Sequence, residues 1–118
     1  MHLAAGVLLL LSATNIMKRV ELIMGRNIPD GGRVSDYMMN EFIKQDIMPH
    51  FDYGTFIDGE GFWKGEHEQT KIFYIEVADS EAIATAVLLK HVADRYRKQF
   101  RQESVLVSEV STNTQFVT

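Results

Sequence analysis

Two helical patterns, each lying between segments of strand periodicity, constrain the fold of this chain more than any other feature. The first begins at Ser35-Asp36, side chains that typically cap a helix N-terminus, and ends at Pro49. The second covers residues 81–100 and follows the capping residues Asp79-Ser80. Its inward stripe is predicted to contain Ile83, Ala86, Val87, Leu89, Ala93, Tyr96 and Phe100.

Alternating apolar and polar residues predict strands on either side of these helices. The first strand covers residues 18–24 and is followed by a turn at Asn27–Gly32. The later strands are predicted at residues 53–63 (bent or interrupted at 58–61), 71–77 and 104–110, with a polar connection at 64–69 and a short fifth strand at 115–117. The order βαββαβ predicts an α+β, ferredoxin-like sandwich: a four-stranded antiparallel sheet with two helices on one face.

The two later core strands carry apolar side chains on both of their faces. Phe73 and Ile75 alternate with Ile72 and Tyr74 in one of them. Because the predicted helices cover only one face of the sheet, the other face needs a second cover. The pattern therefore predicts self-association, with clefts between subunits.

The charge and the cysteine count exclude several classes of function. The net charge is −4, and the densest basic cluster lies within the helix at 81–100, where a solvated helix face explains it. A nucleic-acid partner is therefore not expected. The chain has no cysteine, which excludes disulfides and thiolate chemistry and suits a reducing cytoplasm.

The first 16 residues stand apart from the predicted domain. Leu3–Leu11 has the length of a signal-peptide core, but no basic segment precedes it, and it is too short to span a membrane. Met17 would be a natural alternative start. We interpret residues 1–16 as a dispensable extension of a single domain at 17–118; a cleaved secretion signal is the alternative.

A polar junction follows the second helix. Gln102-Glu103-Ser104 leads into the apolar strand Val105-Leu106-Val107, and a core strand does not need such a polar entrance, so a binding pocket is a reason for it. Together with Tyr53-Gly54-Thr55, with Gly61-Phe62-Trp63-Lys64 and with Lys71 at the start of a strand, the junction resembles the phage-encoded S-adenosylmethionine-degrading enzymes, which are lyases. The resemblance covers residues 17–117.

The resemblance implies a trimer of α/β sandwiches of the kind seen in nitrogen-regulatory (PII-like) proteins, with the substrate bound between subunits. It implies the products 5′-methylthioadenosine and L-homoserine lactone, without a metal or other cofactor. The biological role would be counter-defence: the host's restriction–modification system loses its methyl donor. The protein would then act in the host cytoplasm, with no membrane partner.

The parts of the substrate suggest roles for residues of this chain. Glu68 and Tyr53 are the predicted catalytic residues: Glu68 accepts hydrogen bonds from the ribose hydroxyls, and Tyr53 contacts the substrate tail or sulfonium. The predicted substrate-binding residues are Glu66, Phe62, Trp63, Gln102, Glu103 and Ser104. Glu66 is the alternative ribose acceptor, the aromatic pair would stack on adenine or face the sulfonium, and Gln102 and Glu103 would bind the adenine edge or the amine.

Each of these residues also has an ordinary structural interpretation, as an exposed acid, a packed aromatic or a strand entrance. A metal site at Glu66-His67-Glu68 is disfavoured, because neighbours on an extended segment cannot all point inward. The alternative function is a non-enzymatic, ferredoxin-like oligomer that binds a nucleotide-like ligand. A third is a regulatory or anti-defence protein that acts through protein contacts alone.

Overall fold

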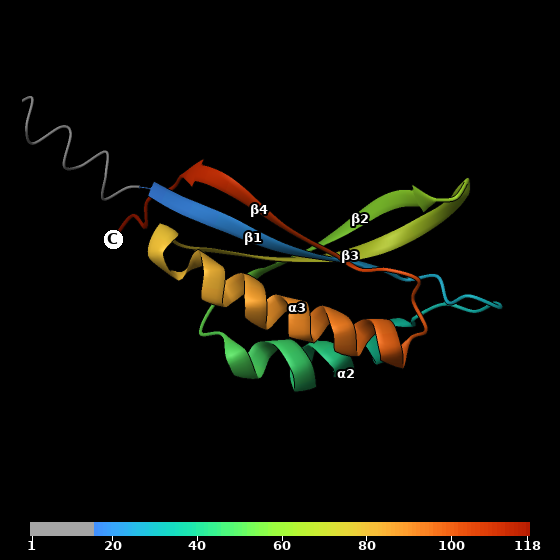
Figure 1. Ribbon diagram of the computed structural model, residues 1–118. Helices are drawn as coiled ribbons and strands as arrows, with labels where there is room; N and C mark the ends of the chain where they lie inside the picture. Colours follow the sequence, from blue (N-terminus) through green and yellow to red (C-terminus); the bar gives the residue numbers. More distant parts are fainter. Residues whose placement is uncertain (1–15) are drawn as a thin grey trace, which may run out of the picture.

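Figure 1 shows a computed structural model, which describes residues 16–118, as an antiparallel sheet with its helices against one face. The elements are β1 (Ile16–Gly25), α2 (Asp36–Phe42), the π-helical turn η1 (Ile43–Ile47), the 3-10 turn η2 (Met48–His50), β2 (Thr55–Trp63), β3 (Glu66–Ala78), the 3-10 turn η3 (Asp79–Glu81), α3 (Ala82–Gln99) and β4 (Leu106–Asn113). The predicted α+β, ferredoxin-like class is confirmed. The predicted extension lies, apart from its last residue, outside the described residues.

The sheet has the order β2-β3-β1-β4, and each neighbouring pair is antiparallel. Each βαβ unit is therefore split by a strand from the other half of the chain: β3 lies between β1 and β2, and β1 lies between β3 and β4. As a result the end of β1, the start of β3 and the start of β4 meet at one end of the sheet.

Local chemistry explains where the helices begin and end. The Ser35 hydroxyl accepts a hydrogen bond from the Met38 N–H at 3.2 Å and so caps α2. The buried guanidinium of Arg26 donates to the Val34 carbonyl and to Asp36 just before and at the start of α2. At the other end of the second helical region, Arg101 has a φ of 53°, and the Gln102 N–H donates to the Arg97 carbonyl, which closes α3.

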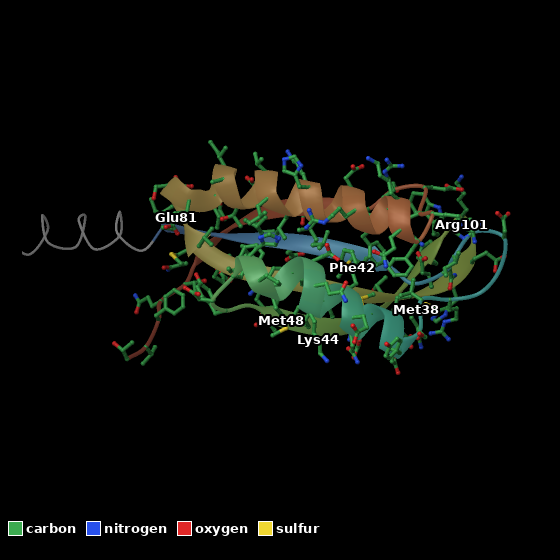
Figure 2. All side chains as sticks on the ribbon, turned by 90° about the horizontal axis from the view of Figure 1, so that it is seen from below. Met38, Phe42, Lys44, Met48, Glu81 and Arg101 are labelled. Carbon is green, nitrogen blue, oxygen red and sulfur yellow. The ribbon has the colours of Figure 1, made fainter. Side chains whose placement is uncertain are left out.

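The core lies between the sheet and both helices. Leu22 of β1 pairs with Phe73 of β3 and Val107 of β4, so these three side chains share the covered face. Figure 2 shows the helices side by side with Phe42 between them. The Phe42 ring packs edge-on against Tyr96, with 5.2 Å between ring centroids, and this aromatic contact joins α2 to α3.

The inward stripe of α3 differs from the prediction at its N-terminal end. Ile83 and Val87 were expected inside, but they are 79% and 47% exposed, so this part of the prediction is wrong. Ala82, which was not predicted to face inward, is buried in their place, together with the predicted Ala86. Leu89, Ala93 and Tyr96, one helical turn apart, fix the rotation of the helix, and that rotation turns the alanines toward the sheet.

Three further segments also differ from the prediction. Residues 64–69 are not a polar loop: Lys64 and Gly65, with φ of 50° and 82°, form the two-residue turn of a hairpin, and β3 already begins at Glu66. β2 runs without a break through residues 58–61, paired with β3. The predicted fifth strand at 115–117 is absent from the described residues, where this segment follows β4 as an irregular tail.

The face of the sheet opposite the helices carries the predicted second apolar surface. Ile57, Ile72, Ile23 and Leu106 pair in register, so they form one row across all strands on this face. Ile57 and Leu106 are 44% and 57% exposed. We call this the open face. No helix among residues 16–118 is long and apolar enough to cross a membrane.

Ser35→Ala is expected to destabilise the protein by about 1 kcal/mol, because it removes the acceptor that caps α2. Chemical denaturation measures the change. Ser80→Ala is the matched control: the sequence predicted a cap here, but neither η3 nor α3 has a side-chain cap hydrogen bond, so its effect should stay within about 0.5 kcal/mol. Equal losses in the two variants would contradict this assignment.

Candidate functional site

A cavity of about 690 Å³ lies at the end of the open face where the β2–β3 hairpin extends past β1 and β4. Its walls come from the loop at residues 27–32, the hairpin end at 61–66 and the junction at 102–104. Its floor is formed by Ile23, Gly25, Thr70 and Leu106. The volume falls within the range of small-molecule sites, about 300–1,000 Å³.

Glu68 of β3 lies across the floor of this cavity. A Cβ built at Gly25 would come within 2.6 Å of both carboxylate oxygens of Glu68, so the glycine leaves the space that the carboxylate occupies. The Asn27 N–H donates to Glu68 Oε2 at 3.0 Å. Asn27 Nδ2 also donates to the His67 carbonyl, which ties the same strand to the loop. The Glu68 carboxylate is thus held by backbone groups at the end of β1.

Glu103 joins the junction to the hairpin end across the rim of the cavity. Its Oε2 accepts from Trp63 Nε1 at 3.2 Å and forms an ion pair with Lys64 Nζ at 2.7 Å. These contacts with Lys64 and Trp63 lower the pKa of the Glu103 carboxyl. The carboxylate therefore stays ionised and holds the Trp63 indole in place.

Gln102 is buried beneath the junction, with 8% of its surface exposed. Its Nε2 donates to the Asn27 carbonyl at 2.7 Å and to the Phe100 carbonyl at 3.2 Å. Its amide nitrogen is thereby engaged with the backbone.

The structure brings most of the predicted site residues together at this cavity. The residues that line it are Phe62, Trp63, Glu66, Glu68, Gln102, Glu103 and Ser104. Glu66 and Glu68 share a face of β3, while His67 between them points to the other. The two acids therefore reach the cavity without the histidine.

Tyr53 is the predicted residue that lies elsewhere. It precedes β2, at the opposite end of the β2–β3 ladder from the hairpin turn, and its hydroxyl donates to the Glu76 carbonyl at 2.6 Å. Its ring packs edge-on against Phe116 of the C-terminal tail. Burial, followed by the neighbouring Glu81, Glu76 and Asp52, raises the pKa of its phenol. Within one protomer it does not meet the cavity.

Sequence reasoning did not predict Gly25, Ile23 and Leu106 as residues of the cavity floor. It interpreted Asn27, whose N–H fixes the acid, as part of a plain turn. Gly25 was the available signal. An isolated glycine at the end of an alternating strand often marks a close approach by another group, and here that group is the carboxylate of Glu68.

The lining favours a ligand that combines positive charge with a flat ring system. Three carboxylates (Glu66, Glu68 and Glu103) and one ammonium group (Lys64) line the cavity, so it disfavours phosphates. Trp63 pairs with Glu66 and so shares the face of the two acids, where it supplies aromatic surface beside the apolar floor. Phe62 also lines the cavity, but it pairs with His67, so its side chain projects toward the opposite face. A cation over such a ring gains roughly 0.5–2 kcal/mol.

Comparison with known proteins supports the fold. Residues 19–116 match the family model described as "Protein of unknown function (DUF3574)". The solved structure of a phage SAM lyase in its apo state is similar, with a TM-score of 0.54 and 16% sequence identity, over 86% of this chain and 92% of the lyase chain. No curated protein sequence matches the chain. The structural likeness shows a shared fold.

Proposed function

This chain belongs to the DUF3574 family, and we propose that it is an S-adenosylmethionine lyase whose substrate binds in the open-face cavity. The observation that carries the proposal is the cavity itself, where a fixed carboxylate, an aromatic wall and a net negative lining meet on an apolar floor. A sulfonium that bears an adenine ring and an ammonium group complements such a lining. The fold shared with a phage SAM lyase supports the same reading.

The proposed reaction uses the substrate's own functional groups. The carboxylate of S-adenosylmethionine attacks its γ-carbon, a C–O bond forms, and the C–S bond breaks with its electron pair moving to sulfur. The products are L-homoserine lactone and neutral 5′-methylthioadenosine. The attack cancels a negative charge against a positive one, so a partly dry cavity that holds the tail curled favours the transition state over the hydrated reactant.

In this proposal the protein binds and orients the substrate. Glu68, held by the Asn27 N–H, accepts hydrogen bonds from the ribose hydroxyls. Trp63, held by Glu103, presents its ring to the adenine or the sulfonium. Glu66 and Ser104, which also line the cavity, contact the remaining polar parts of the substrate. No group of the chain has to transfer a proton, because lactone formation requires none.

We further propose that protomers associate through the open face, in a trimer with sites between subunits. The exposed apolar row of Ile57, Ile72, Ile23 and Leu106 continues into the cavity floor through its last two members. A neighbour on this face would cover the row and exclude water from the cavity. It would also allow Tyr53, remote from the cavity of its own protomer, to act in a neighbour's site. The biological role would be counter-defence against host restriction–modification.

The alternative is a non-enzymatic oligomer that holds a nucleotide-like ligand in the same cavity. Because the lining carries a net negative charge, it would repel phosphates, and the ligand in this alternative is a nucleoside without phosphates. The two functions bind similar molecules and differ in whether the bound molecule is broken.

Incubation of the purified protein with S-adenosylmethionine tests the proposal. We expect loss of substrate with stoichiometric 5′-methylthioadenosine, and homoserine lactone before homoserine, as measured by chromatography with mass detection. A chelator should leave the rate unchanged. Unchanged substrate at high protein concentration would exclude the lyase, and retention of the intact molecule in equilibrium dialysis would then favour the binding module.

A further inference from the structure

We propose that Tyr96 and Gln102 are positioning residues, which hold the backbone of residues 25–27 so that it fixes the Glu68 carboxylate in the cavity. The inference rests on the proposed function, because Glu68 is the carboxylate that faces the substrate there. In contrast to the sequence-based prediction for Gln102, neither residue has to touch the substrate.

Tyr96 holds the end of β1 from beneath. It is fully buried, and its hydroxyl donates to the Gly25 carbonyl at 2.6 Å. Burial raises the pKa of this phenol, so the hydroxyl remains a protonated donor at neutral pH. The ring is fixed by an edge-on contact with Phe42 and a tilted contact with Phe100, so the position of the Gly25 carbonyl is set by the core.

Gln102 holds the next part of the same segment. Its Nε2 donates to the Asn27 carbonyl, and its own backbone N–H donates to the Arg97 carbonyl at the end of α3. The amide is thus anchored on the helix and directed at the loop. Tyr96, in the last turns of α3, and Gln102, just after the helix, thus donate to the carbonyls of the residues before and after Arg26.

The segment that these two hydrogen bonds hold, residues 25–27, is the one that positions the Glu68 carboxylate. The Glu68 carboxylate lies against the Cα side of Gly25 and accepts from the Asn27 N–H. Loss of the hydrogen bond from Tyr96 or of the one from Gln102 would let the segment move, and the carboxylate would move with it. Because a displacement of about 1 Å can cost about 100-fold in rate, donors outside the cavity can control its chemistry.

Tyr96→Phe and Gln102→Met test the inference, because each removes the donor and keeps a side chain of similar length. The direct readout is the NMR signal of the Asn27 amide proton, which donates to a carboxylate. We expect this signal to move upfield and its hydrogen exchange to speed up in both variants, and kcat/KM for S-adenosylmethionine to fall about tenfold or more. Ile47→Val, a core change remote from the cavity lining, controls for lost stability.

The inference is supported if the Asn27 signal moves in both variants, as it should in Glu68→Gln, and stays in place in Ile47→Val. It is overturned if the signal is unchanged in Tyr96→Phe and Gln102→Met, or if Ile47→Val lowers kcat/KM as much at a similar melting temperature. Failure of the proposed function is a separate result. In that case the wild-type protein leaves S-adenosylmethionine intact, while the amide signal still reports whether the segment is held.

Discussion

Glu68→Gln is expected to lower kcat/KM for S-adenosylmethionine by about 10- to 100-fold, while the protein stays folded. Hydrogen bonds to a charged group contribute about 1.5–3 kcal/mol, and the substitution removes the charge but keeps an acceptor oxygen for the Asn27 N–H. The carboxylate lies in the cavity and outside the core, so its neutralisation should not disturb packing. Initial rates of methylthioadenosine release, with denaturation of the same samples, measure both effects.

Glu60→Gln is the matched control for this variant. Glu60 pairs with Gln69 and therefore lies on the opposite face of the hairpin from Glu68. The same chemical change should leave the rate within about twofold of the wild type, because surface substitutions remote from a site are usually near neutral. Full activity in Glu68→Gln would refute its proposed role and move attention to Glu66, which shares its face and the cavity.

The parts of the fold that could be predicted from the sequence are those with buried faces. Alternation around Leu22 and Phe73 located the two central strands, because one side of each is covered by helices. The hairpin at Lys64-Gly65 was missed because β3 between Glu66 and Gln69 runs past the core and is polar on both faces. Periodicity gives no signal where neither face is buried. It also misjudged Ile83, since Ala82, one position away, fits the close approach of α3 to the sheet.

Seven of the eight residues predicted for the site line the cavity, and Tyr53 does not, whereas the hydrogen-bond partners of these residues could not be predicted. Polar and aromatic side chains at the junction and the hairpin drew attention to Glu68 and Trp63, which the structure brings to one cavity. The partners of those side chains come from tertiary structure. The Asn27 N–H and the Gly25 Cα are backbone features, and the Gln102 amide looks the same in sequence whether it faces a ligand or a carbonyl. Sequence identifies chemical groups, and packing decides which of them remain available.

Gly25→Ala is expected to reproduce most of the activity loss of Glu68→Gln, although it replaces no acidic residue. The new Cβ would stand within 2.6 Å of the Glu68 carboxylate, which must move because it is the flexible end of its side chain. Stability should hold or rise slightly, since alanine reduces the entropy of the unfolded chain by about 0.4–1 kcal/mol where its backbone conformation is compatible. The double variant with Glu68→Gln should be no slower than Glu68→Gln alone, because each change removes the same interaction, that of a correctly placed Glu68 carboxylate with the substrate.

Gly61→Ala is the control that distinguishes displacement of the Glu68 carboxylate from a simple reduction of the cavity volume. Gly61 also lines the cavity, but a Cβ there would meet its nearest atoms, in Glu68 and Thr70, at 3.8 Å, which is ordinary van der Waals contact. This variant makes the same chemical change and leaves Glu68 in place, so it should retain most of the wild-type kcat/KM. If the two alanine variants lose activity equally, cavity volume controls the reaction and the fixed position of Glu68 does not. If only Gly25→Ala loses activity, the close approach of the glycine and the carboxylate is what the reaction requires.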